Sequence, residues 1–240
     1  MDKGVLTGCN AEQEWMLKWW WRNYSKHNDY PVTFCDFGMS PGAKNWCAER
    51  GTLLHFDPES LALKKNLSAN WAKQVSLSTW NKRALWFSKA LILSKAPYEK
   101  SIWTDIDCEI LKNLSSLFEL VESKDGFAIA YDSEENAKLA KSNAFLDKSV
   151  PVLQAGVFAF KKNSPVIPAW IDYCLSHLET EASDQTAISH LQAQFSFDIT
   201  ILSNKYNWLT PEYPSPHIVI NHHTGASRKR KLLAEMEWNG

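Results

Sequence analysis

Hydrophobic and polar positions along the chain switch repeatedly between strand-like and helix-like patterns. Short apolar runs predict strands at residues 4–10, 31–36, 52–56, 100–104, 126–132, 152–160, 197–202 and 217–222. Between them, apolar residues three and four positions apart or capping residues predict helices at residues 12–24, 43–49, 81–95 and 134–146, and others opening at residues 164 and 183. Strands that alternate with helices are typical of a mainly parallel sheet covered by helices. The sequence therefore predicts an α/β fold.

Composition narrows the function without naming it. No linker or internal repeat interrupts the 240 residues, so a single domain is expected over 1–240. The formal net charge of −1 gives no electrostatic reason to expect nucleic-acid binding. No apolar run approaches the roughly 18 residues of a membrane span, so no integral membrane segment is expected. Five scattered cysteines without a Cys-x-x-Cys pair predict reduced thiols and a cytoplasmic protein.

Two carboxylates, Asp105 and Asp107, follow directly after the predicted strand at 100–104. Residues two apart on a strand share a face, so both would project from its carboxyl end, where open α/β sheets bind their ligands. Their mutual repulsion is relieved by a cation. A hard divalent ion would keep coordination positions open for nucleotide phosphates. A turn rich in aspartate explains the same two residues, so the pair needs support from the rest of the chain.

Further short motifs stand before and after this pair in a recognisable order. They are Thr7-Gly8-Cys9-Asn10, Asp36-Phe37-Gly38-Met39-Ser40, Trp103-Thr104-Asp105-Ile106-Asp107, Gln154-Ala155-Gly156-Val157-Phe158, Ser183-Asp184-Gln185 and His222-His223-Thr224-Gly225-Ala226-Ser227-Arg228-Lys229. Together they resemble the GT-A glycosyltransferases, most closely the retaining family 8 group of glycogenin and bacterial galactosyltransferases. Two positions depart from that family: Gln154 stands where it usually has Asn, and Arg228 where it usually has Lys, without the usual Pro-Trp after it.

The resemblance implies a single-domain, Rossmann-like GT-A fold with a mixed, mainly parallel sheet. Residues 1–110 would bind the nucleotide, and residues 111–240 the sugar and the acceptor. The implied reaction moves a hexose from a UDP-sugar to a carbohydrate or glycan acceptor, with retention of the anomeric configuration. Asp105, Asp107 and His222 would hold Mn²⁺, or Mg²⁺, because mixed carboxylate and imidazole ligands suit manganese. His223, next in the chain, is an alternative to His222.

The resemblance also implies residues that bind the nucleotide. Those placed near the base, the ribose or the phosphates are Thr7, Asn10, Asp36, Arg83, Lys89, Gly225 and Arg228, with Lys229 beside the last. A guanidinium can pair two phosphate oxygens at once. Turn chemistry alone also explains Asn10 and Asp36, and a solvated basic tail explains Arg228 and Lys229. Arg83 and Lys89 could equally be surface residues.

Four further residues are implied to lie near the donor sugar. Asp132 and Gln154 would contact its hydroxyls, and Asp184 and Gln185 would flank the reacting anomeric carbon as the catalytic candidates. If the retaining mechanism uses a nucleophile, Asp184 and Gln185 bracket it. A simpler explanation for Asp184 is a favourable interaction with the amino end of the predicted helix.

Three other classes of protein share parts of this pattern. A phosphatase of the haloacid dehalogenase type uses the first Asp of such a motif as its nucleophile, which would be Asp105, but there the motif normally opens the domain. A nucleotidyltransferase is expected to carry a Gly-rich, basic loop after its first strand, and Thr7-Gly8-Cys9-Asn10 is not one. A non-catalytic nucleotide- or sugar-binding protein of the same fold would have less need of Asp105, Asp107 and His222.

Overall fold

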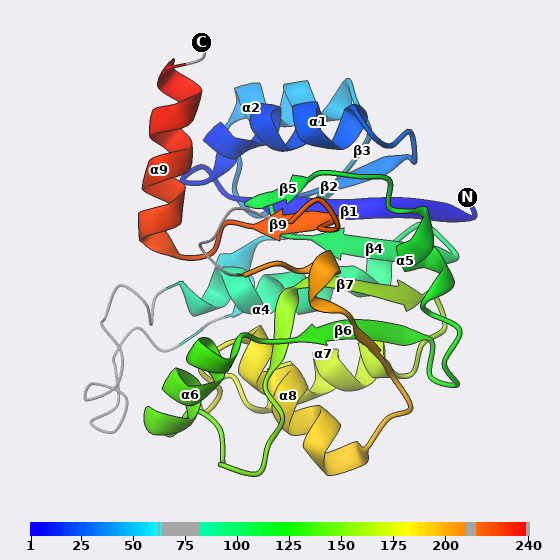
Figure 1. Cartoon of the computed structure of the whole chain (residues 1–240), viewed down its shortest axis with the longest axis vertical. Coiled ribbons are helices and arrows are strands. Elements are labelled where there is room, and N and C mark those ends of the chain that lie inside the picture. The colour runs from blue at the N-terminus through cyan, green and yellow to red at the C-terminus, as the bar shows by residue number, and fades with distance from the viewer. Residues whose placement is uncertain (62, 64–81, 210–214, 239–240) are drawn as a thin grey trace.

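The computed structural model describes residues 1–61, 63, 82–209 and 215–238, in which strands and helices alternate as the sequence predicts (Figure 1). The strands of the first half are β1 (Lys3–Cys9), β2 (Val32–Asp36), β3 (Thr52–His55), β4 (Lys100–Thr104) and β5 (Cys108–Ile110). Its α-helices are α1 (Leu17–Ser25), α2 (Pro41–Ala48) and α4 (Arg83–Ile92). Short 3₁₀ turns occupy Glu14–Met16, Pro58–Leu61 and Leu93–Lys95.

The second half continues the pattern and adds a C-terminal helix. Its strands are β6 (Phe127–Tyr131), β7 (Leu153–Lys161), β8 (Thr200–Leu202) and β9 (Ile220–His222). Its helices are α5 (Ser115–Glu119), α6 (Glu134–Ser142), α7 (Val166–Ser176), α8 (Asp184–Phe195) and α9 (Gly225–Trp238), with a 3₁₀ turn at Asn204–Tyr206. The Ser183 side chain caps α8 by accepting a hydrogen bond from Thr186 N.

Seven strands form one mixed sheet in the order β3-β2-β1-β4-β7-β6-β8. The pairs β3–β2, β2–β1, β1–β4 and β6–β8 are parallel, whereas β7 runs antiparallel to both β4 and β6. The chain moves outward from β1 to β3 and then returns to β4, so the strand order reverses between β1 and β4. Open α/β sheets bind ligands at the carboxyl ends of the strands at such a switch point. Because β7 is antiparallel, its first residues lie at that same edge.

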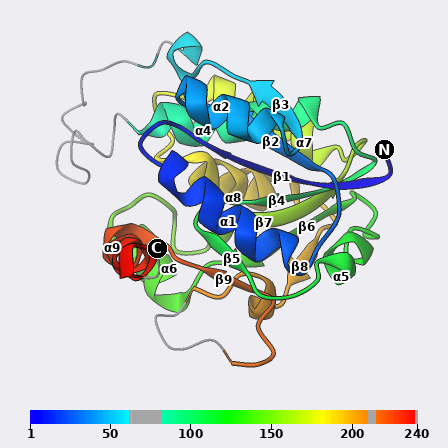
Figure 2. The ribbon, with the colours of Figure 1, turned by 90° about the horizontal axis from the view of Figure 1, so that it is seen from above.

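Helices cover both faces of the sheet, and an apolar core fills each side. On one face Trp20 of α1, Cys47 of α2 and Leu117 of α5 pack together with residues of β1, β2 and β4. On the other face α4, α7 and α8 pack against Trp103 and Phe158. Seen from above, α1 and α7 lie on opposite sides of the strands (Figure 2). This three-layer arrangement leaves the carboxyl edge of the sheet as the place where polar side chains gather.

A second, two-stranded sheet and α9 complete this edge. β5 pairs antiparallel with β9, so that Cys108 lies opposite His222. α9 begins at Gly225, whose φ of 81° lies in the left-handed region that favours glycine. Leu232 holds α9 to the core on the α1 face. In Figure 1, α9 stands on the side of the molecule toward which β4 and β6 run.

The α/β prediction is confirmed, and the differences are local. The strands predicted at 197–202 and 217–222 begin later, at Thr200 and Ile220, and the helix predicted at 134–146 ends at Ser142. The helix predicted at 81–95 ends in a 3₁₀ turn, and its first residue, 81, lies outside the described residues. All five cysteines are free thiols. Within the described ranges, the search for a helix long and apolar enough to span a bilayer found none.

Candidate metal and nucleotide site

The carboxylates of Asp105 and Asp107 lie at the end of β4, where the strand order reverses. Asp105 N donates to the Gly156 carbonyl oxygen at 2.8 Å, which ties the end of β4 to the start of β7. Trp103 Nε1 donates to Asp105 Oδ1 at 2.7 Å. Asp105 keeps part of its carboxylate accessible, with 31% of its side chain exposed, whereas the Asp107 side chain is buried at 7%. The pair thus combines one open and one enclosed carboxylate.

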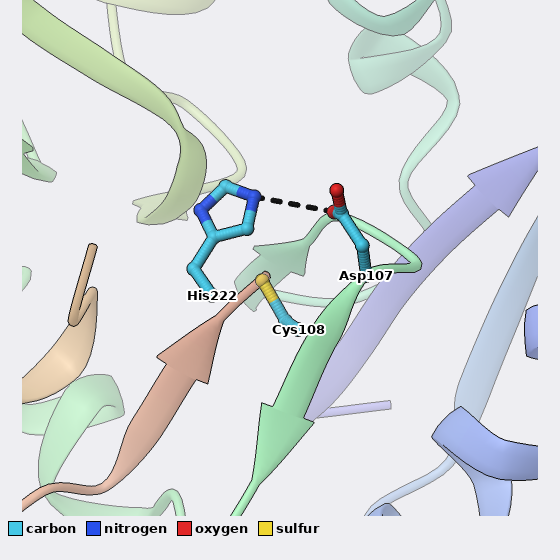
Figure 3. Close-up of side chains that lie close together, drawn as sticks. All are labelled: Asp107, Cys108 and His222. Carbon is cyan, nitrogen blue, oxygen red and sulfur yellow. Dashed lines mark hydrogen bonds and ion pairs between the residues drawn. The ribbon is translucent and has the colours of Figure 1, made fainter. Parts of the chain in front are cut away.

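His222 reaches the same carboxylates from β9. Its Nε2 lies 3.2 Å from Asp107 Oδ1 and 3.9 Å from Asp105 Oδ2. Its Nδ1 lies 2.9 Å from Asn207 Oδ1. Figure 3 shows the imidazole turned toward Asp107, with Cys108 between the two strands. The three residues expected to bind a metal are therefore brought together, because β5–β9 pairing places residues more than 110 positions apart side by side.

The contact between His222 and Asp107 needs a positive charge. Asn207 Oδ1 has only lone pairs, so His222 Nδ1 must donate to it, and Nε2 then faces Asp107 either as the N–H of an imidazolium or as the lone pair of a neutral ring. Two acceptors 3.2 Å apart in a buried site require a proton or a metal ion between them. Imidazole nitrogen and carboxylate oxygens are ligands of divalent metals, so the residues present fit the metal that the resemblance implies.

Cys108 is the other possible ligand. One ligand atom each of Asp107, Cys108 and His222 lie within 4.8 Å of one another. Burial, together with the carboxylates of Asp107 and Asp105, raises the pKa of the Cys108 thiol well above its ordinary value. The sulfur lies 3.9 Å from the Gly156 carbonyl oxygen. A protonated thiol is a poor ligand for a hard cation, so Asp105 with its open carboxylate completes the set better.

Two lysines from opposite sides of the site contact these carboxylates. Lys89 of α4 lies 2.8 Å from Asp184 Oδ2 and 3.4 Å from Asp105 Oδ1, and it donates to the Ala155 carbonyl oxygen at 2.9 Å. Burial alone would lower the pKa of Lys89, but Asp105 and Asp184 outweigh it and raise that pKa. Lys229 of α9 lies 2.8 Å from Asp107 Oδ2. Burial opposes ionisation of Asp107, yet His222 and Lys229 hold its pKa below the ordinary value. Both lysines therefore stay charged.

Lys229, and not Arg228, faces the carboxylates. The Arg228 guanidinium donates to the Leu209 carbonyl oxygen at 2.8 Å and to Asn221 Oδ1 at 2.9 Å. Successive residues of a helix point about 100° apart, so only one of two neighbours can face the site. Motif spacing favoured Arg228, and the structure assigns that residue to holding α9 against β9. Gly225 supplies the turn that begins the helix, and a side chain there would meet no atom within 4 Å.

Asp184, the partner of Lys89, is followed by Gln185, which in turn contacts Asp132. Asp184 is buried at the start of α8, where desolvation raises its pKa although Lys89 opposes the shift. Gln185 Nε2 donates to Asp132 Oδ2 at 2.8 Å, and its Oε1 accepts from Ala155 N at 3.4 Å. Asp132 Oδ1 accepts from Ser133 N and Asn136 Nδ2. The two residues expected to flank the sugar carbon are thus held at the same edge as the metal ligands.

The residues expected to bind the base and ribose lie at the carboxyl ends of β1 and β2. Thr7 Oγ1 and Asn10 Oδ1 are buried without a hydrogen-bond partner among the described residues, which leaves their hydrogen-bonding capacity unmet. Asp36 is different, because Gly38 N, Met39 N, His55 Nδ1 and Lys44 Nζ all lie within 2.9 Å of its carboxylate oxygens. Burial opposes ionisation, but these donors hold the Asp36 pKa at about 2. Its oxygens are already occupied.

A cavity of about 100 Å³ joins the two ends of this site. Gly8 after Thr7, Trp86 and Lys89 of α4, Asp105 and Lys229 are among the residues that line it. It therefore extends from the end of β1, past the two aspartates, to α9. Two lysines and two aspartates are thus among the lining residues, and this combination suits an anion held through a metal ion.

Neither Arg83 nor Gln154 is among the residues that line this cavity. The Arg83 guanidinium is buried and donates to the carbonyl oxygens of Leu178 and Glu181, which ties α4 to the segment between α7 and α8. Gln154 is also buried, and its Oε1 accepts from Gly156 N and from Asn207 Nδ2, both at 2.7 Å. The contacts of Arg83 and Gln154 are with the protein itself, so we assign Arg83 to the fold and Gln154 to the support of His222.

Comparisons with known proteins agree with this architecture. No family model and no curated protein matches the sequence. Among solved structures, the galactosyltransferase LgtC with donor and acceptor sugar analogues is 13% identical, with a TM-score of 0.58 over 94% of this chain and 87% of LgtC. Mouse xyloside xylosyltransferase 1 is 12% identical, with a TM-score of 0.59 over 92% and 97%. GlyE of Streptococcus pneumoniae is 15% identical, with a TM-score of 0.59 over 93% and 55%.

This chain has the GT-A glycosyltransferase fold. The predicted fold is therefore confirmed over nearly the whole chain, from β1 to α9. The GT-A sheet places its switch point between β1 and β4, where Asp105 and Asp107 lie. Identity of 15% or less leaves the reaction itself to be argued from the site.

Asn207 is a residue of this site that sequence patterns do not point to. It lies in a loop 15 residues before His222 and belongs to none of the short motifs. Its only signal is polar character next to an apolar stretch, which is common in loops.

Proposed function

We propose that the chain is a glycosyltransferase that moves a hexose from a UDP-sugar to a carbohydrate acceptor, with Mn²⁺, or Mg²⁺, at Asp105, Asp107 and His222. The observation that carries the proposal is the approach of His222 Nε2 to Asp107 Oδ1 at 3.2 Å, with Nδ1 already donating to Asn207. The GT-A fold and its likeness to LgtC with donor and acceptor sugar analogues support the nucleotide-sugar substrate.

The charges around the cavity fit a sugar diphosphate. When bound, the cation would neutralise the charge that develops on the departing UDP. Lys229 and Lys89 lie on opposite sides of Asp105 and Asp107, where they would grip the diphosphate and orient the bond to the sugar. Thr7 and Asn10 would supply their unpartnered oxygens to the base and ribose. In this arrangement the base and ribose would lie at the end of β1, and the diphosphate would extend toward the start of α9.

Retention of configuration is part of the proposal, and the contacts of the carboxylates favour one route to it. Asp184 is paired with Lys89, and Asp132 receives bonds from Ser133, Asn136 and Gln185. These contacts hold both carboxylates in place, which favours attack by the acceptor over attack by either carboxylate. We therefore assign Gln185 to the sugar through its amide, Asp184 to orienting Lys89, and the incoming acceptor to the face from which UDP departs. An LgtC structure with an active-site glutamine changed to glutamate directs attention to such an amide.

The remaining parts of the proposal concern the whole chain. Residues 1–240 would act as a single domain, with residues 1–110 binding the nucleotide and residues 111–240 the sugar and acceptor. Five free, buried thiols favour a cytoplasmic, reducing environment.

Calorimetric titration of UDP tests this function directly. Wild type should bind UDP with Mn²⁺ present and far more weakly with a chelator. Asp105→Asn with Asp107→Asn preserves side-chain size but removes both charges, and should abolish the Mn²⁺-dependent part. Asp198→Asn, an exposed carboxylate that receives a bond from Lys124 N, serves as the matched control. Binding should then be followed by hydrolysis of one UDP-hexose, with the anomeric form of the released sugar read by NMR.

The outcomes separate the competing functions. Mn²⁺-dependent UDP binding without turnover of any UDP-hexose, alone or with acceptors, would favour a binding protein of this fold. Absence of UDP binding together with hydrolysis of a generic phosphoester that needs Asp105 would favour the phosphatase. An inverted sugar product would overturn the assignment of retention alone.

A further inference from the structure

The donor and the acceptor of each hydrogen bond behind His222 can be assigned. Gly156 N can only donate, so the Gln154 side-chain atom 2.7 Å away must be the carbonyl oxygen Oε1. The same oxygen lies 2.7 Å from Asn207 Nδ2, which must therefore donate to it. A flipped Gln154 would place an amide N–H against a backbone N–H. A main-chain amide thus fixes the orientation of both side-chain amides.

This orientation determines which nitrogen of His222 carries the proton. With Nδ2 directed to Gln154, Asn207 must present Oδ1 to His222 Nδ1 at 2.9 Å. Nδ1 is then the protonated nitrogen, and Nε2 faces Asp107. Gln154, Asn207 and His222 are 7%, 2% and 1% exposed, so water is excluded from replacing any of these bonds.

We propose that Asn207 and Gln154 are positioning residues that fix the tautomer and ring plane of His222, so that Nε2 is presented as a metal ligand. The inference rests on the metal site of the proposed function. A metal binds the ring nitrogen that lacks a proton, and the partner of the other nitrogen decides which one that is. In the absence of Asn207 Oδ1, the proton can move to Nε2, where it blocks coordination.

The backbone around Asn207 is built to hold this geometry. Trp208 N donates to the Ile220 carbonyl oxygen at 3.0 Å, and His222 N donates to the Trp208 carbonyl oxygen at 2.9 Å. Asn207 N donates to the Asn204 carbonyl oxygen at 3.0 Å. The loop is therefore fastened to β9 through Trp208, the residue directly after Asn207. Any displacement of Asn207 would carry the His222 strand with it.

Gln154 has the length that this network needs. The GT-A family that the sequence resembles usually has Asn at this position. Here the side chain reaches its own Gly156 N and Asn207 at the same time, with no contact left for a sugar hydroxyl on Oε1. Its shorter homologue would lose the bond to Asn207. The departure from the family pattern therefore bears on the support of the proposed metal ligand.

Mn²⁺ binding, followed by the EPR signal of the free ion, is the test. Asn207→Leu and Gln154→Met remove the relay at nearly constant side-chain volume, and each should weaken Mn²⁺ binding by about 10–100-fold. Asn28→Leu is the matched control, since Asn28 is also buried and holds Leu114 N and the Lys112 carbonyl oxygen through its amide. The control should bind Mn²⁺ as wild type does. Unchanged Mn²⁺ affinity in both relay variants would overturn the inference.

Imidazole ¹⁵N NMR of the metal-free wild type gives an independent reading. At alkaline pH, His222 should show a protonated, pyrrole-like Nδ1 and an unprotonated, pyridine-like Nε2, with His222→Gln assigning its signals among the seven histidines. The opposite pattern would refute the relay even if the Asn207 and Gln154 variants misfolded. If wild type binds no Mn²⁺, the proposed metal site fails, while the NMR pattern still decides whether Asn207 fixes the tautomer.

Discussion

Gly156→Ala tests whether the position of His222 controls the site. A Cβ built on Gly156 would lie 2.8 Å from His222 Nδ1 and 2.9 Å from Gln154 Oε1, and would overlap His222 Cε1. Ordinary carbon contacts of about 3.5 Å would require the ring to withdraw by about 1 Å. Metal ligands tolerate errors of only about 0.2 Å in distance. The added methyl group should therefore displace Nε2 beyond the reach of an ion held by Asp105 and Asp107.

The magnitude follows from the same geometry. Displacing a buried ligand by this much should weaken Mn²⁺ binding by about 10–100-fold, as for loss of a supporting contact. Overpacking should also cost about 1–3 kcal/mol of folding free energy. For a chain of this size each kcal/mol lowers the melting temperature by roughly 2–4 °C. The loss of metal binding should persist well below that melting temperature, where the variant is folded.

Gly42→Ala is the matched control, because a Cβ there would meet only Ser40 Oγ at 3.9 Å inside α2. That change should leave Mn²⁺ binding intact and stabilise the helix by about 0.5–1 kcal/mol. EPR titration of Mn²⁺ and thermal unfolding measured by circular dichroism give both quantities. Equal Mn²⁺ affinity in Gly156→Ala and Gly42→Ala would refute the claim that His222 is a ligand held in place by this close contact.

Other side chains give shorter tests. Lys89→Met leaves the Asp184 carboxylate buried without its cation and should lower the free energy of unfolding by about 3–5 kcal/mol at neutral pH. The loss should be smaller in acid, because Asp184 then takes up a proton. Urea unfolding measures it, with the exposed Lys148→Met as the control. A hydrogen bond to Glu181 raises the pKa of His190. The pair therefore contributes its full stabilisation of the fold below pH 6.5 and loses it as the pH rises through the raised pKa. His190→Gln should remove this pH dependence from the free energy of unfolding measured by denaturation. Cys108→Ala should bind Mn²⁺ as tightly as wild type does in the EPR assay. A large loss of Mn²⁺ affinity would show instead that the Cys108 thiol is a ligand.

Local patterns were enough to predict the order of elements. Each strand from β1 to β4 and each helix between them carries its own apolar periodicity, which does not depend on distant contacts. Asp105 and Asp107 were found for the same reason, because two residues at the end of one strand lie together whatever the rest of the chain does. The strand at 217–222 that contains β9 was predicted, but its partner β5 was not, since a strand of three residues is defined mainly by its pairing.

Other features of the site depend on which residues are neighbours in three dimensions, and local sequence patterns do not reveal them. Arg228 and Lys229 are adjacent in sequence, and only the rotation of α9 decides which faces Asp107. The same helix was read as either a tail or a phosphate contact, because its basic run hides the buried Leu232. Asn207 has no local signal at all, since its partners lie 53 residues before it and 15 after it.

The direction of β7 has a consequence for how the protein matures. Because this strand runs against its neighbours, Gly156 at its beginning meets Asp105 at the end of β4, and both then await His222 from β9. Contacts between such distant segments form late, after the loops between them have closed. During synthesis, the cluster of Asp105, Asp107 and His222 thus arises only after β9 has emerged and paired with β5. A nascent chain that stops short of β9 would hold a nearly finished main sheet without this cluster.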